Sequence, residues 1–120
     1  MPTILIVDDY AVARRILSHT LQRNGHVVVS AADGTEALAR LDDTPVDLAI
    51  IDIAMPGMDG LTLLRHLRER DSESTLPVIM LSASGQDEDR QTARALGAHD
   101  FLSKPASSQE LLDAVGRLLA

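Results

Sequence analysis

The sequence contains no cysteine and no tryptophan, and it has only one tyrosine and one phenylalanine among its 120 residues. Without cysteine the chain can form no disulfide bond, thiolate metal site or cysteine nucleophile. So few aromatic side chains also argue against a surface on which nucleotide bases, sugars or a flavin ring would stack. A chain without cysteine suits a reducing compartment, and we therefore expect a cytoplasmic protein.

Long apolar runs and positive charge are also scarce. No apolar run comes near the roughly 20 residues that a membrane-spanning helix needs, so we expect no membrane contact. The opening Met-Pro-Thr lacks the basic region of a secretory signal. Lys and Arg total 11 against 18 Asp and Glu, a formal net charge of −7. This balance argues against direct nucleic-acid binding and favours cationic partners or a bound metal ion.

Short β-branched runs alternate with amphipathic segments along the whole chain. Continuous apolar runs, typical of strands buried on both faces of a parallel sheet, predict strands at 4–7, 27–30, 48–53, 78–81 and 101–102. Helical spacing and capping signals predict helices within 12–24, 33–41, 61–67, 88–96 and 107–119. This pattern predicts one α/β domain over residues 1–120, with a mostly parallel sheet covered by helices on both faces.

Polar residues stand at the end of four of the five predicted strands. Asp8 and Asp9 follow the first, Asp52 lies at the end of the third, Ser82 follows the fourth and Lys104 follows the fifth. Sites in open parallel sheets lie beyond the carboxyl ends of the strands, so we expect these side chains to converge. Any one of them alone would more often cap a helix. Together they indicate a functional site.

Asp52 is the most informative of these residues. It lies among three isoleucines, where a carboxylate loses its hydration unless something binds it. Further carboxylates nearby raise at least one pKa by repulsion. A divalent cation resolves this conflict, because Mg²⁺ takes oxygen ligands from carboxylates, water and phosphate. We therefore expect Asp52 and Asp8 or Asp9 to hold Mg²⁺, with a backbone carbonyl after Asp52 as a further ligand.

The chemistry that these groups support is phosphoryl transfer to a carboxylate. An aspartate is able to act as the nucleophile and form an aspartyl phosphate. The charge on the transferring oxygens must then be neutralised by a metal ion and fixed cations. The metal would serve one oxygen, Lys104 a second, and the Ser82 hydroxyl with nearby backbone N–H groups a third.

These residues give the sequence a resemblance to the receiver domain of two-component response regulators, the chemotaxis-regulator-like family, from Ile4 to Leu119. Four elements carry it: Ile-Leu-Ile-Val before Asp8-Asp9, Asp52 followed at residue 55 by Met-Pro-Gly-Met-Asp-Gly, Ser82-Ala83, and Lys104-Pro105. The resemblance implies a (βα)5 flavodoxin-like fold with three α/β/α layers. Its doubly wound, five-stranded parallel sheet would have the strand order 2-1-3-4-5.

The resemblance also implies a role for each matching acidic residue. Asp52 would be the phosphoacceptor. Asp8 and Asp9 would be the acidic pair that positions Mg²⁺ or Mn²⁺, and the backbone carbonyl of Ala54 would be a further ligand.

Three other residues match the family's switch and phosphate contacts. Ser82 would be the switch hydroxyl, in a place where many members have threonine. Phe101 would be the switch aromatic, without the hydrogen bond of a phenol. Lys104 would contact the phosphoryl group, and the bond between Lys104 and Pro105 would be cis.

The function implied is a signalling switch and not an enzyme with a separate substrate. Asp52 would accept a phosphoryl group from a sensor histidine kinase or a histidine phosphotransfer protein. Ser82 would then move toward the phosphate and Phe101 would turn inward, reshaping the face of the fourth helix, fifth strand and fifth helix. That face would serve a downstream protein, a fused output domain or a homodimer, because a stand-alone receiver and one cut from a longer protein both fit.

Three alternatives share part of this pattern. A haloacid-dehalogenase-type phosphatase also uses an aspartate nucleophile, but that family places a second acid where Ala54 stands. A flavodoxin-like carrier needs a Ser/Thr/Gly-rich phosphate loop where Asp8 and Asp9 stand. A phosphate-independent interaction domain has no use for the complete acidic site.

The remaining charged side chains have simpler interpretations. We expect Arg14 and Arg15 on the first predicted helix to be solvated. The acidic residues 87–89 would favour the start of the fourth helix through its dipole.

Overall fold

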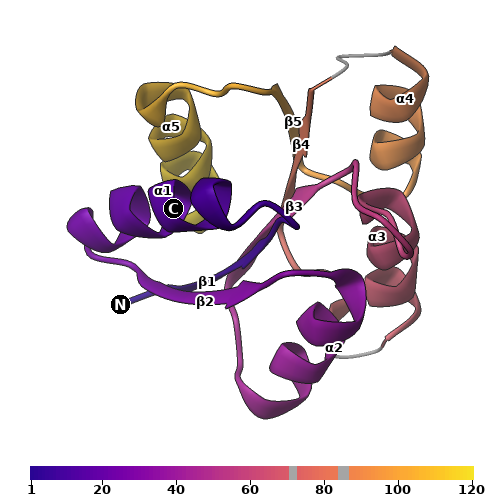
Figure 1. Cartoon of the computed structure of the whole chain (residues 1–120), viewed down its shortest axis with the longest axis horizontal. Helices are drawn as coiled ribbons and strands as arrows, with labels where there is room; N and C mark the ends of the chain where they lie inside the picture. The colour runs from indigo at the N-terminus through magenta and orange to yellow at the C-terminus, as the bar shows by residue number, and fades with distance from the viewer. Residues whose placement is uncertain (71–72, 84–86) are drawn as a thin grey trace.

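A computed structural model of the chain describes residues 1–70, 73–83 and 87–120, and in these segments strands alternate with helices (Figure 1). The strands are β1 (Thr3–Val7), β2 (Val27–Ala31), β3 (Leu48–Asp52), β4 (Val78–Ser82) and β5 (Asp100–Ser103). The helices are α1 (Ala11–Arg23), α2 (Gly34–Asp43), α3 (Gly60–Glu69), α4 (Asp87–Ala95) and α5 (Ser108–Leu119). The predicted α/β fold is confirmed.

The strands form one parallel sheet in the order β2-β1-β3-β4-β5, as the family resemblance implied. The register of β1 with β3 pairs Val7 with Ile51. An aspartate comes next in each case, Asp8 just after β1 and Asp52 as the last residue of β3, so this register sets Asp8 beside Asp52. Pairing of β1 with β3, which are distant in sequence, is therefore what assembles the acidic groups.

Helices cover both faces of the sheet. In Figure 1, α1 and α5 lie on one side and α2, α3 and α4 on the other. Successive side chains of a strand point to opposite faces. Accordingly, Leu5 packs into the core beneath α2 and α3, whereas Ile4 packs into the core beneath α1 and α5, and both are fully buried. Burial on both faces explains why the strands are continuous apolar runs.

Local signals in the sequence mark the starts of α2 and α5 and the end of α4. Asp33 caps α2 by accepting a hydrogen bond from the Glu36 N–H at 2.8 Å. Ser107 and Glu110 form the predicted capping box of α5. Gly97 follows α4 with φ 87°, a conformation that favours glycine.

The predicted strand bounds differ from the observed ones mainly in β5. The sequence predicts only residues 101–102, but the strand runs from Asp100 to Ser103. Its ends are polar and carry no apolar signal. Pairing with β4, from Ile79 to Ser82, extends β5 over them.

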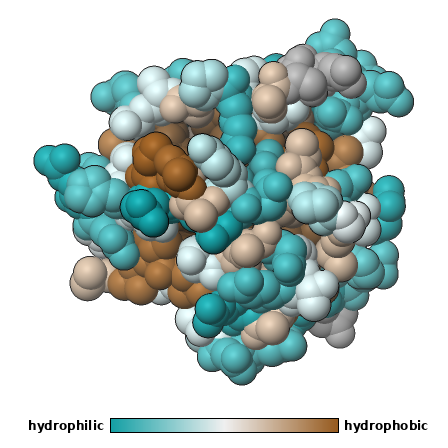
Figure 2. Space-filling view, viewed as in Figure 1, coloured by the Kyte–Doolittle hydropathy of each residue, from teal (hydrophilic) through white to brown (hydrophobic). Residues whose placement is uncertain are grey.

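The face of the molecule shown in Figure 2 is largely hydrophilic, with hydrophobic side chains gathered beside α1. Among the exposed hydrophobic side chains of α1, Ile16 is 60 % exposed. Within the described parts of the chain, no helix has the length and apolar character needed to cross a membrane.

Candidate functional site

Three aspartates meet at the carboxyl ends of β1 and β3. Asp8 and Asp52 are buried, at 1 % and 4 % exposed, while Asp9 is exposed. Each offers a carboxylate oxygen, and these oxygens lie within 4.8 Å of one another. The structure thus brings together the acidic residues that the sequence pointed to, two of them away from water.

Lys104 reaches this cluster from the end of β5. Its Nζ lies 2.7 Å from Asp8 Oδ2 and 3.3 Å from Asp52 Oδ2. Its backbone N–H donates to the Ser82 carbonyl at 2.8 Å, and the peptide bond to Pro105 is cis. The lysine therefore bridges the two buried carboxylates.

The electrostatics of the cluster follow from its burial. Loss of hydration raises the pKa of Asp52 above its ordinary 3.8; Lys104 opposes this rise and the Asp8 charge adds to it. Burial acts to lower the pKa of Lys104, but its contacts with Asp8 and Asp52 outweigh burial and raise it. The cluster thus stabilises a cation.

This donor set suits a hard divalent ion. Oxygen atoms are the ligands that Mg²⁺ prefers, and the three aspartates supply carboxylate oxygens at close range. The pocket already attracts one cation, the Lys104 ammonium, to Asp8 and Asp52. The residues present therefore fit Mg²⁺ or Mn²⁺.

The loop after Asp52 is folded back against β3. The Gly60 N–H donates to the Ile53 carbonyl at 2.9 Å, and Gly57 has φ 74°. A side chain at Gly60 would place its Cβ 2.3 Å from the Asp52 carbonyl oxygen. Glycine at this position lets the start of α3 lie against the strand end, and Ala54 stays exposed at the mouth of the site.

Ser82 ends β4 beside the cluster and is 3 % exposed. The sheet pairs it with Ser103, the residue before Lys104. Its hydroxyl is therefore positioned by the same strand pair that delivers the lysine. Residues 84–86, in the loop that follows, lie outside the described parts of the chain.

Sequence reasoning missed the contact that Arg14 makes with the acidic cluster. The Arg14 Nη1 donates to the Asp8 carbonyl at 2.7 Å, and Arg14 is half-buried. The expectation that both arginines would be solvated is wrong for this residue and correct for Arg15, which is exposed. No sequence signal separates the two, because only the path of the β1–α1 turn decides which one faces Asp8.

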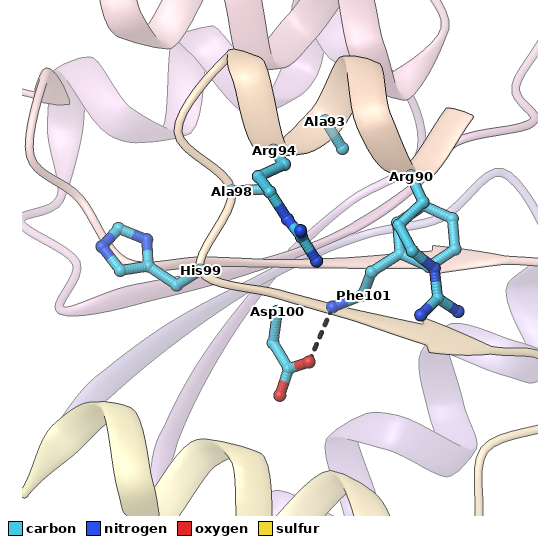
Figure 3. A pocket seen from close by; sticks show the side chains of 7 residues that line it. All are labelled: Arg90, Ala93, Arg94, Ala98, His99, Asp100 and Phe101. Atoms are coloured by element: carbon cyan, nitrogen blue, oxygen red, sulfur yellow. Dashed lines mark hydrogen bonds between the residues drawn. The ribbon is translucent and has the colours of Figure 1, made fainter. Parts of the chain in front are cut away.

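Phe101 lies on a different flank, between β5 and α4. The Arg90 guanidinium carbon lies 5.0 Å from the centroid of its ring, a cation–π contact (Figure 3). The neighbouring Asp100 forms an ion pair with Arg117 of α5. Adjacent residues of β5 thus contact α4 and α5, and no local pattern in the sequence indicates either contact.

The chain is similar to proteins of one family in sequence and in structure. Residues 4–116 match the family described as the response regulator receiver domain. The chain is 43 % identical over 118 residues to the response regulator GtcR of Aneurinibacillus migulanus, covering 98 % of this chain and 46 % of that protein. It is 37 % identical over 119 residues to the phosphate regulon transcriptional regulatory protein PhoB of Rhizobium meliloti, covering 99 % and 52 %.

The fold is also similar to that of a solved chemotaxis protein. CheY4 of Vibrio cholerae superposes with a TM-score of 0.95 at 37 % identity, and the match covers 99 % of each chain. The chain therefore spans the whole of this structure, but only about half the length of the curated relatives it matches.

Proposed function

The chain belongs to the response regulator receiver domain family, and from this we propose that it is a phosphorylation-dependent switch with Asp52 as the phosphoacceptor. The observation that carries the proposal is the buried Asp52 carboxylate, which lies beside Asp8 and Lys104 at the carboxyl ends of the strands. The donor would be the phosphohistidine of a sensor histidine kinase or a histidine phosphotransfer protein.

In the proposed reaction an Asp52 carboxylate oxygen attacks the phosphorus of the donor. The new P–O bond forms as the P–N bond to the donor histidine breaks, and the imidazole leaves with the bonding electrons. Lys104, already 3.3 Å from Asp52 Oδ2, neutralises charge on one phosphoryl oxygen, and the Ser82 hydroxyl donates to another. Attack of water on the aspartyl phosphate releases phosphate and restores Asp52.

Asp8, Asp9, Asp52 and the Ala54 carbonyl would hold Mg²⁺ or Mn²⁺. When bound, the ion supplies positive charge to the phosphoryl oxygens. Asp8 contributes by placing its carboxylate next to Asp52 without exposing either to water. The same burial that raises the pKa of Asp52 strengthens every charge interaction in the pocket.

The switch would run from Ser82 to Phe101. A phosphoryl group on Asp52 adds acceptor oxygens that draw the Ser82 hydroxyl toward it. The volume that Ser82 leaves lets Phe101 turn inward, away from Arg90. This changes the α4-β5-α5 face, on which Phe101, Arg90 and Arg117 lie, and this face would contact the output partner.

The output would be a protein contact in the cytoplasm. The relative PhoB is named a transcriptional regulatory protein and is about twice the length of this chain. We propose residues 1–120 as one receiver domain that acts on a downstream protein, on a fused output domain or on a second copy through the α4-β5-α5 face.

The direct test is incubation with Mg²⁺ and a small-molecule acyl phosphate, followed by intact mass measurement. We expect one phosphoryl adduct on the unaltered protein and none on Asp52→Asn. Asp33→Asn is the matched control, because Asp33 is an exposed helix cap and asparagine caps equally well; it should keep the adduct. An undiminished adduct on Asp52→Asn, or steady release of phosphate from simple monoesters, would contradict the proposal.

A further inference from the structure

Asp8 is held through all four of its polar groups. Its N–H donates to the Ala31 carbonyl at 3.2 Å. Its Oδ1 accepts from the Tyr10 N–H at 2.9 Å, and its Oδ2 accepts from Lys104. Its carbonyl oxygen, which lies past the end of β1, accepts from Arg14 at 2.7 Å. Arg14 is therefore the one side chain among these partners that holds the Asp8 backbone.

The N-cap residue of α1 gives the start of this helix no side-chain cap. Tyr10 at the N-cap makes no side-chain cap hydrogen bond, and the first turn contains no acidic residue. In α2, α3 and α5, by contrast, the side chains of Asp33, Asp59 and Ser107 cap the first turn. Within α1, Arg14 is therefore the side chain that binds the turn carrying Asp8 and Asp9.

We propose that Arg14 is a positioning residue for the metal site. By binding the Asp8 carbonyl, it holds the β1–α1 turn so that the carboxylates of Asp8 and Asp9 stay on the same side as that of Asp52. The inference rests on the proposed function, because it concerns cation binding by this cluster. Arg14 itself would touch neither the cation nor the phosphoryl group.

Two effects of Arg14 on cation binding have opposite signs, which makes the inference testable. A guanidinium near three carboxylates repels a divalent cation, so loss of its charge alone would tighten binding. Loss of its hydrogen bond frees the turn and weakens binding. Residues that orient metal-bound carboxylates typically change metal affinity by about 10–100-fold when removed, whereas the charge of a half-buried guanidinium is still partly screened by water and contributes less. Positioning should therefore dominate.

The experiment compares Arg14→Met with Arg15→Met. Arg15 is the adjacent, exposed arginine of α1, and its replacement removes the same charge without touching Asp8. The Mg²⁺ dissociation constant is measured by following the Tyr10 backbone amide in an NMR titration. The thermal unfolding midpoint with chelator present reports stability, and intact mass gives the rate of adduct formation from an acyl phosphate at low and saturating Mg²⁺.

We expect Arg14→Met to weaken Mg²⁺ binding about tenfold, and Arg15→Met to leave it unchanged or tighten it by about twofold at most. Adduct formation in Arg14→Met should be slow at low Mg²⁺ and return to the unaltered rate at saturation. A merely structural role would lower the unfolding midpoint without this dependence on Mg²⁺.

The inference is overturned if Arg14→Met binds Mg²⁺ as tightly as the unaltered protein or more tightly. It is also overturned if the rate of adduct formation in Arg14→Met stays low at saturating Mg²⁺. Should Arg14→Met not fold, Arg14→Ala replaces it, with Arg15→Ala as its control, because alanine has the highest helix propensity and donates no side-chain hydrogen bond. Weaker Mg²⁺ binding in Arg14→Ala alone would support the hydrogen bond, and unchanged binding would overturn it. If the unaltered protein itself shows neither Mg²⁺ binding nor an adduct, the proposed function fails.

Discussion

Asp52 is a carboxylate in a place where an apolar side chain would be more stable. It is the last residue of a fully buried strand, and its neighbours in β3 are apolar. Burial and the nearby Asp8 both raise its pKa, and the Lys104 ammonium offsets only part of this. Such a cost is typical of a residue kept for its chemistry.

We therefore predict that Asp52→Asn stabilises the fold when no divalent cation is present. Because the pKa of Asp52 is higher in the folded protein than in the unfolded chain, its protonated carboxyl group favours folding. This contribution to stability is complete below the unfolded pKa and is lost as the pH rises through the folded pKa. At neutral pH the charged form opposes folding, so asparagine should raise the free energy of unfolding by about 1 kcal/mol. The gain should shrink as pH falls toward the ordinary pKa of 3.8.

Urea denaturation followed by circular dichroism measures this change, because the chain has no tryptophan to report by fluorescence. Asp33→Asn should be neutral, since it changes an exposed cap. A loss of stability in Asp52→Asn at neutral pH would mean that the ion pair with Lys104 outweighs burial and repulsion.

At the scale of the elements, the junction of β3 with α3 is closely packed and lies beside the acidic cluster. Gly60 begins α3, and the Asp52 carbonyl oxygen and the Ile53 Cα occupy the space that its Cβ would need. Both obstacles are backbone atoms and have little freedom to shift. The close approach fixes the loop that carries Ala54 beside Asp52.

Gly60→Ala should therefore destabilise the protein by about 3 kcal/mol, as overpacking against backbone does. Gly116→Ala is the matched control: Gly116 lies within α5, where a Cβ would meet nothing within 4 Å, so alanine should stabilise by about 0.5–1 kcal/mol. Urea denaturation of both variants gives the comparison. Equal changes in the free energy of unfolding at the two glycines would show that the backbone of the β3–α3 junction shifts easily to accommodate a Cβ.

At the scale of the whole molecule, the site that would bind the phosphoryl group and the face that would contact the output partner lie on different strands of the sheet. The acidic cluster lies at the ends of β1 and β3, whereas Phe101 lies on β5 under Arg90 of α4. Ser82 ends β4, the strand between them, and pairs with Ser103 of β5. Any coupling between the two regions must act on one element with two arrangements.

We predict that Ser82→Ala uncouples the two regions. The chain has a single phenylalanine, so the ring resonances of Phe101 can be assigned directly in an NMR spectrum. Phosphorylation should shift them in the unaltered protein, and the shift should fall by about fivefold or more in Ser82→Ala. Intact mass must show equal adduct occupancy in both samples. Ser103→Ala, which changes an exposed serine of β5, should keep the full shift, and a full shift in Ser82→Ala would contradict the coupling.

Much of the fold was predictable because its signals are local. Apolar runs identify the buried strands, the pair Ser107 and Glu110 marks the start of α5, and alternation of strands and helices implies a parallel sheet. The position of polar residues at strand ends then indicated which side chains would meet. The short prediction for β5 failed because its polar ends, Asp100 and Ser103, become strand only by pairing with β4.

By itself, then, the sequence determined the order of the elements and the set of residues at the site, since periodicity and strand ends are properties of the local chain. Only the tertiary structure decided which atoms meet. The β1–β3 register sets Asp8 beside Asp52, and the β1–α1 turn presents Arg14 to the Asp8 carbonyl while Arg15 stays in solvent. Packing of α4 places Arg90 over Phe101. These contacts depend on how distant segments pack, and adjacent residues of the same type carry no signal that distinguishes them.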